Sequence, residues 1–171
     1  KMKQHYLFLL FVVGLLFISC SRDDDKSSDT EKYYVKFKIN DIQKEDYYKT
    51  ALEDFEQSSI FEEYPKGKYT FQLLDIISVQ FNKSDFQPKI YSWNYTNSSN
   101  NMNFRWFDYL DPQSGNKFSF PYISGSNMTF NITSVSNNEV RGTFTGKIIA
   151  SSNGSQKAFN ITNGEFYAPI R

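Results

Sequence analysis

The feature that most constrains the fold of this chain is a period of two in its apolar residues, which returns many times. Tyr33, Val35, Phe37 and Ile39 alternate with polar or charged residues. Alternation of this kind is typical of a β-strand with one face buried. The pattern returns in residues 42–48, 86–95, 102–109, 118–122 and 128–132.

Polar segments rich in Asn, Ser, Asp and Gly separate these stretches, at 40–41, 96–101, 111–116, 136–139 and 152–155. Turns that recur about every ten residues between short strands predict an all-β sandwich or barrel. Phe, Tyr and Trp, which favour strands, number 17, 12 and 2 of the 171 residues. We therefore expect an antiparallel β-sandwich of about eight to ten strands.

Two segments are less regular. In residues 49–63, Ala51, Leu52 and Phe55 share one helical face, which predicts a short helix or a long loop. Residues 68–82 are strongly apolar and suit either one long strand or two strands joined by a bulge. Asp75 lies in the middle of this run, where its carboxylate needs partners or a position at a bend.

The first nineteen residues have the parts of a secretory signal peptide. Lys1 and Lys3 precede an apolar run over 6–18, and the small residue Ser19 follows. The run is shorter than the roughly 20 residues that span a bilayer. A buried core helix is the alternative, but it would carry polar residues at helical spacing.

Cys20 is the only cysteine and directly follows Ser19. Ile18-Ser19-Cys20 resembles the lipobox of bacterial lipoproteins. The resemblance implies cleavage before Cys20, a diacylglycerol thioether on its sulfur and an acylated new N-terminus. Two or more acyl chains hold a protein stably in a membrane, whereas one does so only marginally. The alternative, a free thiol or half of a disulfide, has no partner cysteine within the chain.

A basic residue and three acids come next: Arg22, Asp23, Asp24 and Asp25. This order resembles the export signal of Bacteroidota surface lipoproteins, which implies display on the outer face of the outer membrane. An ordinary solvated tether is the other interpretation. We expect residues 20–31 to be a flexible tether and residues 32–171 to form a single domain.

Loss of residues 1–19 would remove two lysines and the single histidine, leaving seventeen basic against nineteen acidic residues. The resulting charge of −2 offers no basic surface for nucleic acid. Without histidine, and with its only thiol lipidated, such a chain excludes Ser-His-Asp and Cys-His catalysis and His- or Cys-based zinc sites. We expect no enzyme activity, no metal and no cofactor.

The sharpest candidates for ligand contacts are aromatic. If two adjacent strands present them to solvent, their rings provide a surface for stacking on sugars or for anchoring a protein; if they face inward they are core. These residues are Tyr91, Trp93, Tyr95, Trp106 and Tyr109, with Phe104 beside them.

Oxygen ligands form weaker candidates. Asp108, Asp111 and Asn116 are spaced closely enough to suggest Ca²⁺, although turn chemistry explains them as well. Paired carboxylates for glycoside hydrolysis would have to come from acids that no spacing pattern selects. These acids are Asp75, Glu139 and Glu165.

Residues 140–144 (VRGTF) and 161–166 (ITNGEF) resemble the closing motif of uncharacterised Bacteroidota lipoproteins, and residues 37–41 (FKIND) resemble their opening strand. That resemblance implies a β-sandwich-like fold without an assigned activity. Gly142 and Gly146 alternate with Phe144 and leave room for a ring or a bulge. Asn163-Gly164 is predicted to adopt the positive φ of a tight turn. A hairpin that closes the sandwich explains the motif more simply than a binding role.

Together these features predict a lipid-anchored, surface-exposed outer-membrane protein that binds a glycan or a protein partner. A structural envelope or immunity lipoprotein without a small ligand is the alternative, and a hydrolase is a third.

Overall fold

A computed structural model of the chain describes residues 33–48, 58–63, 67–96, 101–119, 123–136 and 138–170. The chain divides into two compact units, Lys1–Thr30 and Glu31–Arg171. All described residues belong to the second unit. The predicted signal peptide, the lipidation site Cys20 and the export signal Arg22, Asp23, Asp24 and Asp25 lie outside the described residues and stay predictions.

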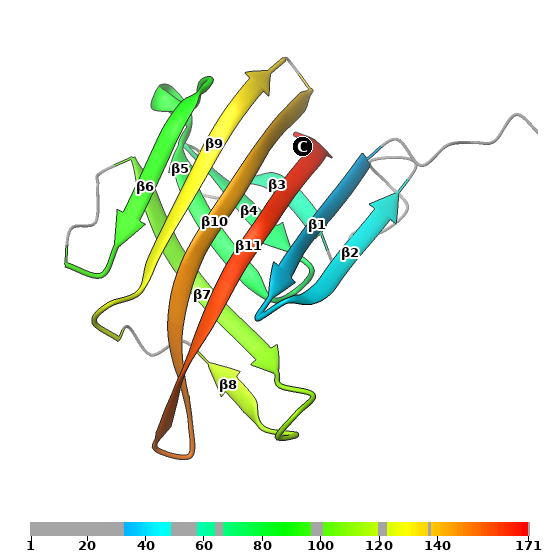
Figure 1. The fold of residues 1–171 in the computed structure, drawn as a ribbon. Coiled ribbons are helices and arrows are strands. Elements are labelled where there is room, and N and C mark those ends of the chain that lie inside the picture. Colours follow the sequence, from blue (N-terminus) through cyan, green and yellow to red (C-terminus); the bar gives the residue numbers. More distant parts are fainter. Residues whose placement is uncertain are drawn as a thin grey trace, which may run out of the picture. The chain divides into compact units, whose positions relative to one another are not determined.

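The described part of the second unit is almost entirely β-structure, as expected from the alternation (Figure 1). Its elements in chain order are β1 (Tyr33–Ile39), β2 (Ile42–Tyr48), β3 (Ser58–Glu63), β4 (Lys68–Leu73), β5 (Ile77–Asn82), the 3-10 turn η1 (Lys83–Asp85), β6 (Lys89–Asn94), β7 (Met102–Leu110), β8 (Lys117–Ser119), β9 (Asn127–Val135), β10 (Glu139–Ser152) and β11 (Ser155–Pro169).

The strands form two antiparallel layers that face each other (Figure 1). The front layer has the order β2-β1-β11-β10-β9-β6, and the back layer has the order β3-β4-β5-β7-β8. At one end β8 also pairs with β10, through Ser119 and Ser151. A single parallel bridge between Ile60 of β3 and Ile170 links the layers again. The described domain is therefore an open, sandwich-like all-β fold.

Local turn chemistry fixes two of the hairpins in the front layer. Asn40 and Asp41 connect β1 to β2 with φ angles of 47° and 68°. Asn153 and Gly154 connect β10 to β11 with φ angles of 49° and 81°. Two consecutive residues with positive φ suit a two-residue hairpin because their twist matches that of the strands. Both turns are confirmed as predicted.

The prediction of a helix or a loop over residues 49–63 is wrong for its second half. Ser58–Glu63 is strand β3, and it pairs along its whole length with β4. Ile60 is buried, opposite Phe71. Pairing with a neighbouring strand outweighs a weak helical pattern, since propensity is easily overridden by tertiary contacts. Residues 49–57 lie outside the described part.

The apolar run 68–82 divides into two strands, β4 and β5, at a tight turn. Leu74 and Asp75 occupy this turn with φ angles of 54° and 52°. The Asp75 carboxylate accepts a hydrogen bond from the Gln72 side-chain amide. The acid in the middle of the run therefore lies at a bend, which is one of the two positions that its charge allowed.

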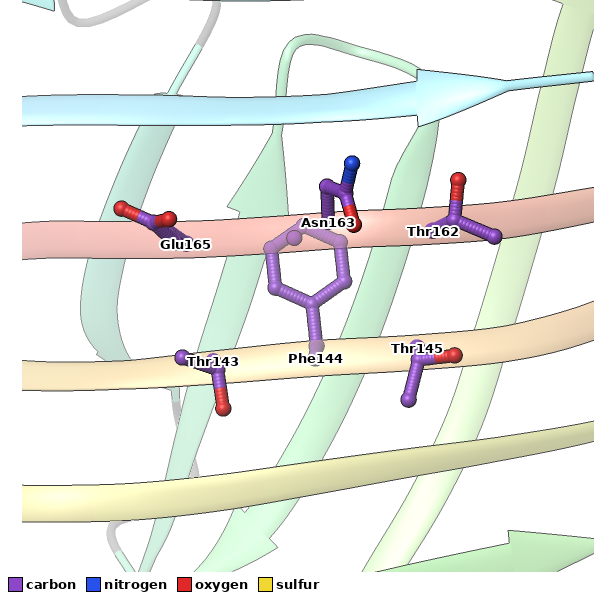
Figure 2. A pocket seen from close by; sticks show the side chains of 7 residues that line it. Thr143, Phe144, Thr145, Thr162, Asn163 and Glu165 are labelled. Carbon is purple, nitrogen blue, oxygen red and sulfur yellow. The ribbon is translucent and has the colours of Figure 1, made fainter. Parts of the chain in front are cut away.

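Bulges in β7 and β11 change which side chains of these two strands face the core. In β7, Phe104 lies opposite Val79 and Trp106 opposite Ser78, so Arg105 is an extra residue. In β11, Thr162 and Asn163 together lie opposite Thr145 of β10 (Figure 2). Each bulge shifts the alternation by one residue, which turns the following side chains to the other face.

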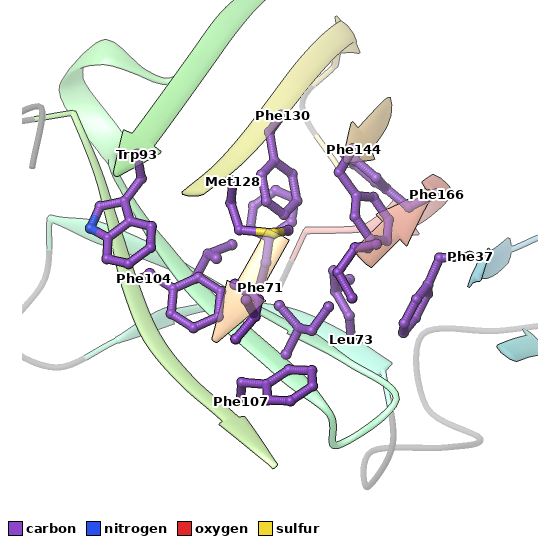
Figure 3. Packing of buried hydrophobic residues seen from close by; sticks show 14 of the residues in the cluster. Phe37, Phe71, Leu73, Trp93, Phe104, Phe107, Met128, Phe130, Phe144 and Phe166 are labelled. Atoms are coloured by element: carbon purple, nitrogen blue, oxygen red, sulfur yellow. The ribbon is translucent and has the colours of Figure 1, made fainter. Parts of the chain in front are cut away.

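Aromatic rings from both layers fill the core (Figure 3). Phe71 of the back layer is fully buried, and its ring centroid lies 5.6 Å from that of Phe166 in the front layer. Phe130 and Phe144 stack within the front layer at 5.2 Å, with an angle of 12° between their planes. Edge-to-face and offset contacts of this kind add to the stability gained by burial.

Candidate functional site

Three of the five aromatic residues proposed for ligand contact are core residues. Tyr91, Trp93 and Tyr109 are only 2%, 3% and 4% exposed. The Trp93 ring stacks on Phe104 at 5.0 Å (Figure 3). Of the two orientations that the sequence left open, the core position therefore holds for all three and the proposed ligand contact does not, because their strand faces point toward the opposite layer.

Tyr91 has a clear structural role. Its hydroxyl donates to the Asp85 carbonyl at 2.6 Å and accepts a hydrogen bond from the Gln87 amide at 2.9 Å. Burial raises the pKa of the Tyr91 phenol, and the hydrogen bond with Gln87 partly offsets this. The ring thus fastens the η1–β6 connection to the core.

The bulge in β7 explains the positions of Trp106 and Tyr109. Strict alternation predicts Phe104 and Trp106 on one face, with Arg105, Phe107 and Tyr109 on the other. In the structure Phe104, Phe107 and Tyr109 are all buried, while Arg105 is exposed and Trp106 is half-buried. The extra residue at Arg105 moves Phe107 and Tyr109 to the side of Phe104. Tyr95, just after β6, is 44% exposed.

The acids that sequence spacing suggested as Ca²⁺ ligands have protein partners instead. The Asp111 carboxylate lies 2.7 Å from the Lys157 Nζ atom and accepts a hydrogen bond of the same length from the Ser114 hydroxyl. These two bonds, that of Lys157 first, lower the pKa of Asp111. Asp108 pairs with Lys117 at 3.2 Å. A turn therefore accounts for Asp111, and contacts between the paired strands β7 and β8 account for Asp108. The described residues contain no cluster able to hold a metal ion.

The acids considered for glycoside hydrolysis are each held by a different partner. Asp75 binds Gln72 at the β4–β5 turn. Glu139 accepts hydrogen bonds from the hydroxyls of Tyr33 and Tyr167, at 2.9 and 2.7 Å. Glu165 lies 3.0 Å from the Lys36 Nζ atom on the outer face. The three acids therefore do not form a carboxylate pair of the kind that glycoside hydrolysis requires.

The middle of the outer face of the front layer carries short polar side chains, whereas the rings of Tyr34 and Tyr167 lie farther along the same face, beside Arg141. Strand register places the short polar side chains in two neighbouring rows that cross β6, β9, β10 and β11. One row contains Asn131, Thr143 and Glu165, flanked by Ile90 on β6 and Lys36 on β1, and the other contains Ser92, Thr129, Thr145, Thr162 and Asn163, flanked by Lys38 on β1. Neutral hydroxyl and amide groups therefore dominate the centre of this face.

An open depression of about 460 Å³ lies on this face where β10 and β11 pair (Figure 2). Its lining comes from the sequence motif near the C-terminus: Thr143, Phe144, Thr145, Thr162, Asn163, Gly164 and Glu165. We define these seven residues as the bulge depression. Its volume falls in the range of small-molecule sites, about 300–1,000 Å³.

The bulge itself creates the depression. Ile161 and Phe166 face the core, whereas Thr162 and Asn163 both face outward although they are adjacent in sequence. Asn163 adopts a φ of 53°, which asparagine tolerates better than most residues do. The Thr145 hydroxyl donates to the Ile161 carbonyl at 3.0 Å and fixes this geometry. Thr162 and Asn163 thus form a bulge within a strand. The predicted positive φ is found at Asn163, but the prediction of a tight turn at Asn163-Gly164 is wrong.

The two strand glycines confirm the prediction that they make room for neighbours. A Cβ atom on Gly142 would lie 2.7 Å from the Phe166 ring and 2.5 Å from the Asn131 carbonyl oxygen. A Cβ atom on Gly146 would lie 2.3 Å from the Met128 sulfur. A Cβ atom on Gly164 would likewise lie 2.6 Å from the Phe144 ring. The motif therefore packs core rings directly beneath the depression.

Sequence reasoning missed the bulge depression because it assigned the motif a structural role. A signal is nevertheless present: core-facing positions Phe159 and Ile161 are two apart, while Ile161 and Gly164 are three apart. Such a break of the period of two next to Asn-Gly indicates a bulge. Bulges often redirect side chains at functional sites.

Comparison with known protein families, with curated proteins and with solved structures gives no match for this chain. Among the described residues, no helix has both the length and the hydropathy required to cross a bilayer. The assignment of a function therefore rests on the sequence signals and on the geometry of the domain.

Proposed function

We propose that this chain is a lipid-anchored outer-membrane protein, displayed on the cell exterior, whose β-sandwich domain binds an extracellular glycan or protein partner. Cys20 carries the lipid, and the segment with Arg22, Asp23, Asp24 and Asp25 directs export to the outer face. The domain functions as a binding module and carries out no catalysis.

The observation that carries the binding part of the proposal is the bulge depression. It lies on an outer face of neutral polar side chains, and its lining includes three threonines and one asparagine. Hydroxyl and carboxamide groups both donate and accept hydrogen bonds. The acids considered for catalysis are occupied in separate parts of the fold, which favours binding over hydrolysis.

The anchor is tested by growing cells with labelled palmitate. We expect label on the wild-type protein and none on a Cys20→Ser variant, because the thioether and the acylated N-terminus both require the cysteine. An unlabelled wild-type protein would remove the basis for the membrane assignment.

Surface display is tested by treating intact cells with a protease. We expect the wild-type protein to be digested, and a variant with Asp23, Asp24 and Asp25 replaced by asparagine to be protected while still carrying label. Equal protection of both proteins would place the domain on the periplasmic side of the outer membrane and refute display on the cell exterior.

A structural or immunity lipoprotein without a small ligand is a second candidate, and one observation favours it. The Trp93 ring, the best stacking surface in the sequence, is buried against Phe104. The two candidates differ in one measurement, since a structural or immunity lipoprotein should retain no glycan on the outer face of the front layer.

A further inference from the structure

We propose that the bulge depression is a binding site for a neutral, hydroxyl-rich ligand, namely a stretch of an uncharged glycan chain that lies across β9, β10 and β11. This inference rests on the proposed function and names its ligand class and its site.

The lining matches the chemistry of sugars. Thr143, Thr145 and Asn163 are exposed, and Thr162 lies beside Asn163 at the bulge. The hydroxyls of Thr143 and Thr162 each provide one donor and two acceptor positions, and the carboxamide of Asn163 provides two donors and an acceptor. The Thr145 hydroxyl donates its proton to the Ile161 carbonyl, so it offers a ligand only acceptor positions. A saccharide ring carries hydroxyls with the same dual capacity, so its hydrogen-bonding groups match those of the lining in kind.

The charges of the lining favour a neutral ligand over an acidic one. Glu165 is the only charged residue in the lining, and its carboxylate lies 3.0 Å from the Lys36 Nζ atom. An anionic ligand would lie next to this carboxylate, whereas a neutral one would leave the ion pair intact. Lys38 and Lys147 lie on neighbouring positions of the same face, so acidic glycans are the comparison that tests this argument.

The site is largely organised before any ligand binds. The bond from Thr145 to the Ile161 carbonyl fixes the bulge, and the Phe144 ring, 2% exposed, supports Gly164 from below. Threonine side chains have few rotamers to lose, so ordering them costs little free energy. Pre-organisation of this kind raises affinity by lowering the cost of binding.

The depression has no exposed ring on which a sugar can stack, because Phe144 faces the core. Its affinity must therefore come from neutral hydrogen bonds, each of modest strength. The polar rows continue onto β9 and β6 through Thr129, Asn131 and Ser92. A longer neutral oligosaccharide should accordingly bind more tightly than its monosaccharide.

The experiment uses the lipidated full-length protein in a detergent without a sugar headgroup, applied to an array of neutral and acidic glycans. The affinity of each glycan that binds is then measured by calorimetry for the wild type and for the variants Asn163→Gly and Thr143→Val. Asn163→Gly removes the amide but keeps a residue that accepts a φ of 53°. We expect each variant to lose about fivefold in affinity, the effect of about one neutral hydrogen bond.

Asn153→Gly is the matched control, because Asn153 also has a positive φ, 49°, but lies at the far β10–β11 turn. Its affinity should equal that of the wild type. Binding that all variants retain would overturn the site and leave the proposed function standing. Binding of acidic glycans alone would overturn the ligand class. Absence of any glycan hit, with palmitate label and surface display intact, would overturn the inference and leave the protein-partner or structural alternative.

Discussion

Replacement of Gly142 by alanine provides a direct test of how the front layer packs. A Cβ atom at this position would lie 2.5 Å from the Asn131 carbonyl oxygen and 2.7 Å from the Phe166 Cζ atom. An ordinary contact needs about 3.5 Å, so each neighbour would have to move by about 1 Å. The oxygen belongs to the backbone of β9, which pairs with β10, and the ring is packed in the core.

The expected cost follows from these contacts. Overpacking a core site typically costs about 1–3 kcal/mol. Because one of the two clashes at Gly142 is with backbone, we expect a loss of about 2–3 kcal/mol in the free energy of unfolding, or about 6–12 °C in Tm for a domain of this size. Urea unfolding of the purified protein measures this loss, with tryptophan fluorescence as the probe, since Trp93 is stacked on Phe104 in the core.

Gly154 provides the control, because a Cβ atom there meets nothing within 4 Å although φ is +81°. Gly154→Ala should cost about 1 kcal/mol, from backbone strain alone. Gly154→Asn should recover part of this loss, since asparagine tolerates positive φ, whereas Gly142→Ser should recover nothing. A Gly142→Ala protein within about 0.5 kcal/mol of the wild type, or a larger loss at Gly154, would refute the packing argument.

Two further predictions concern polar contacts that hold the fold together. Glu139→Gln should lower the free energy of unfolding by about 1–2 kcal/mol, because one of the hydroxyls of Tyr33 and Tyr167 loses its acceptor; equal urea midpoints for variant and wild type would contradict this. Asp111 has a lowered pKa, mainly because of the hydrogen bond with Lys157, so its stabilising contribution is complete above the ordinary carboxyl value of 3.8 and is lost as the pH falls through the lowered pKa. Unfolding midpoints measured from neutral pH to about pH 2.5 should therefore fall less steeply for Asp111→Asn than for the wild type. Parallel curves would contradict a stabilising role of the bond between Asp111 and Lys157.

Local sequence determined most strands and turns of this protein. Side-chain alternation at residues 33–39 and 128–132 reflects one buried face, and the structure confirms β1 and β9 there. Asn-Asp at 40–41 and Asn-Gly at 153–154 supply residues that accept positive φ, so both hairpins follow from local chemistry. These features need only neighbours in sequence, and for this reason sequence patterns report them well.

The positions of the bulges were decided by the tertiary structure. The extra residue Arg105 puts Phe104 and Tyr109 on the same face, and the pair Thr162 and Asn163 opens the bulge depression. Each bulge arises where a strand must keep two different neighbours in register while its rings reach the facing layer. Whether Trp93 contacts a ligand or the core depends on that facing layer, which no local pattern specifies. Sequence therefore predicted the class of fold and the motif, whereas packing between the layers selected the surface that is left for binding.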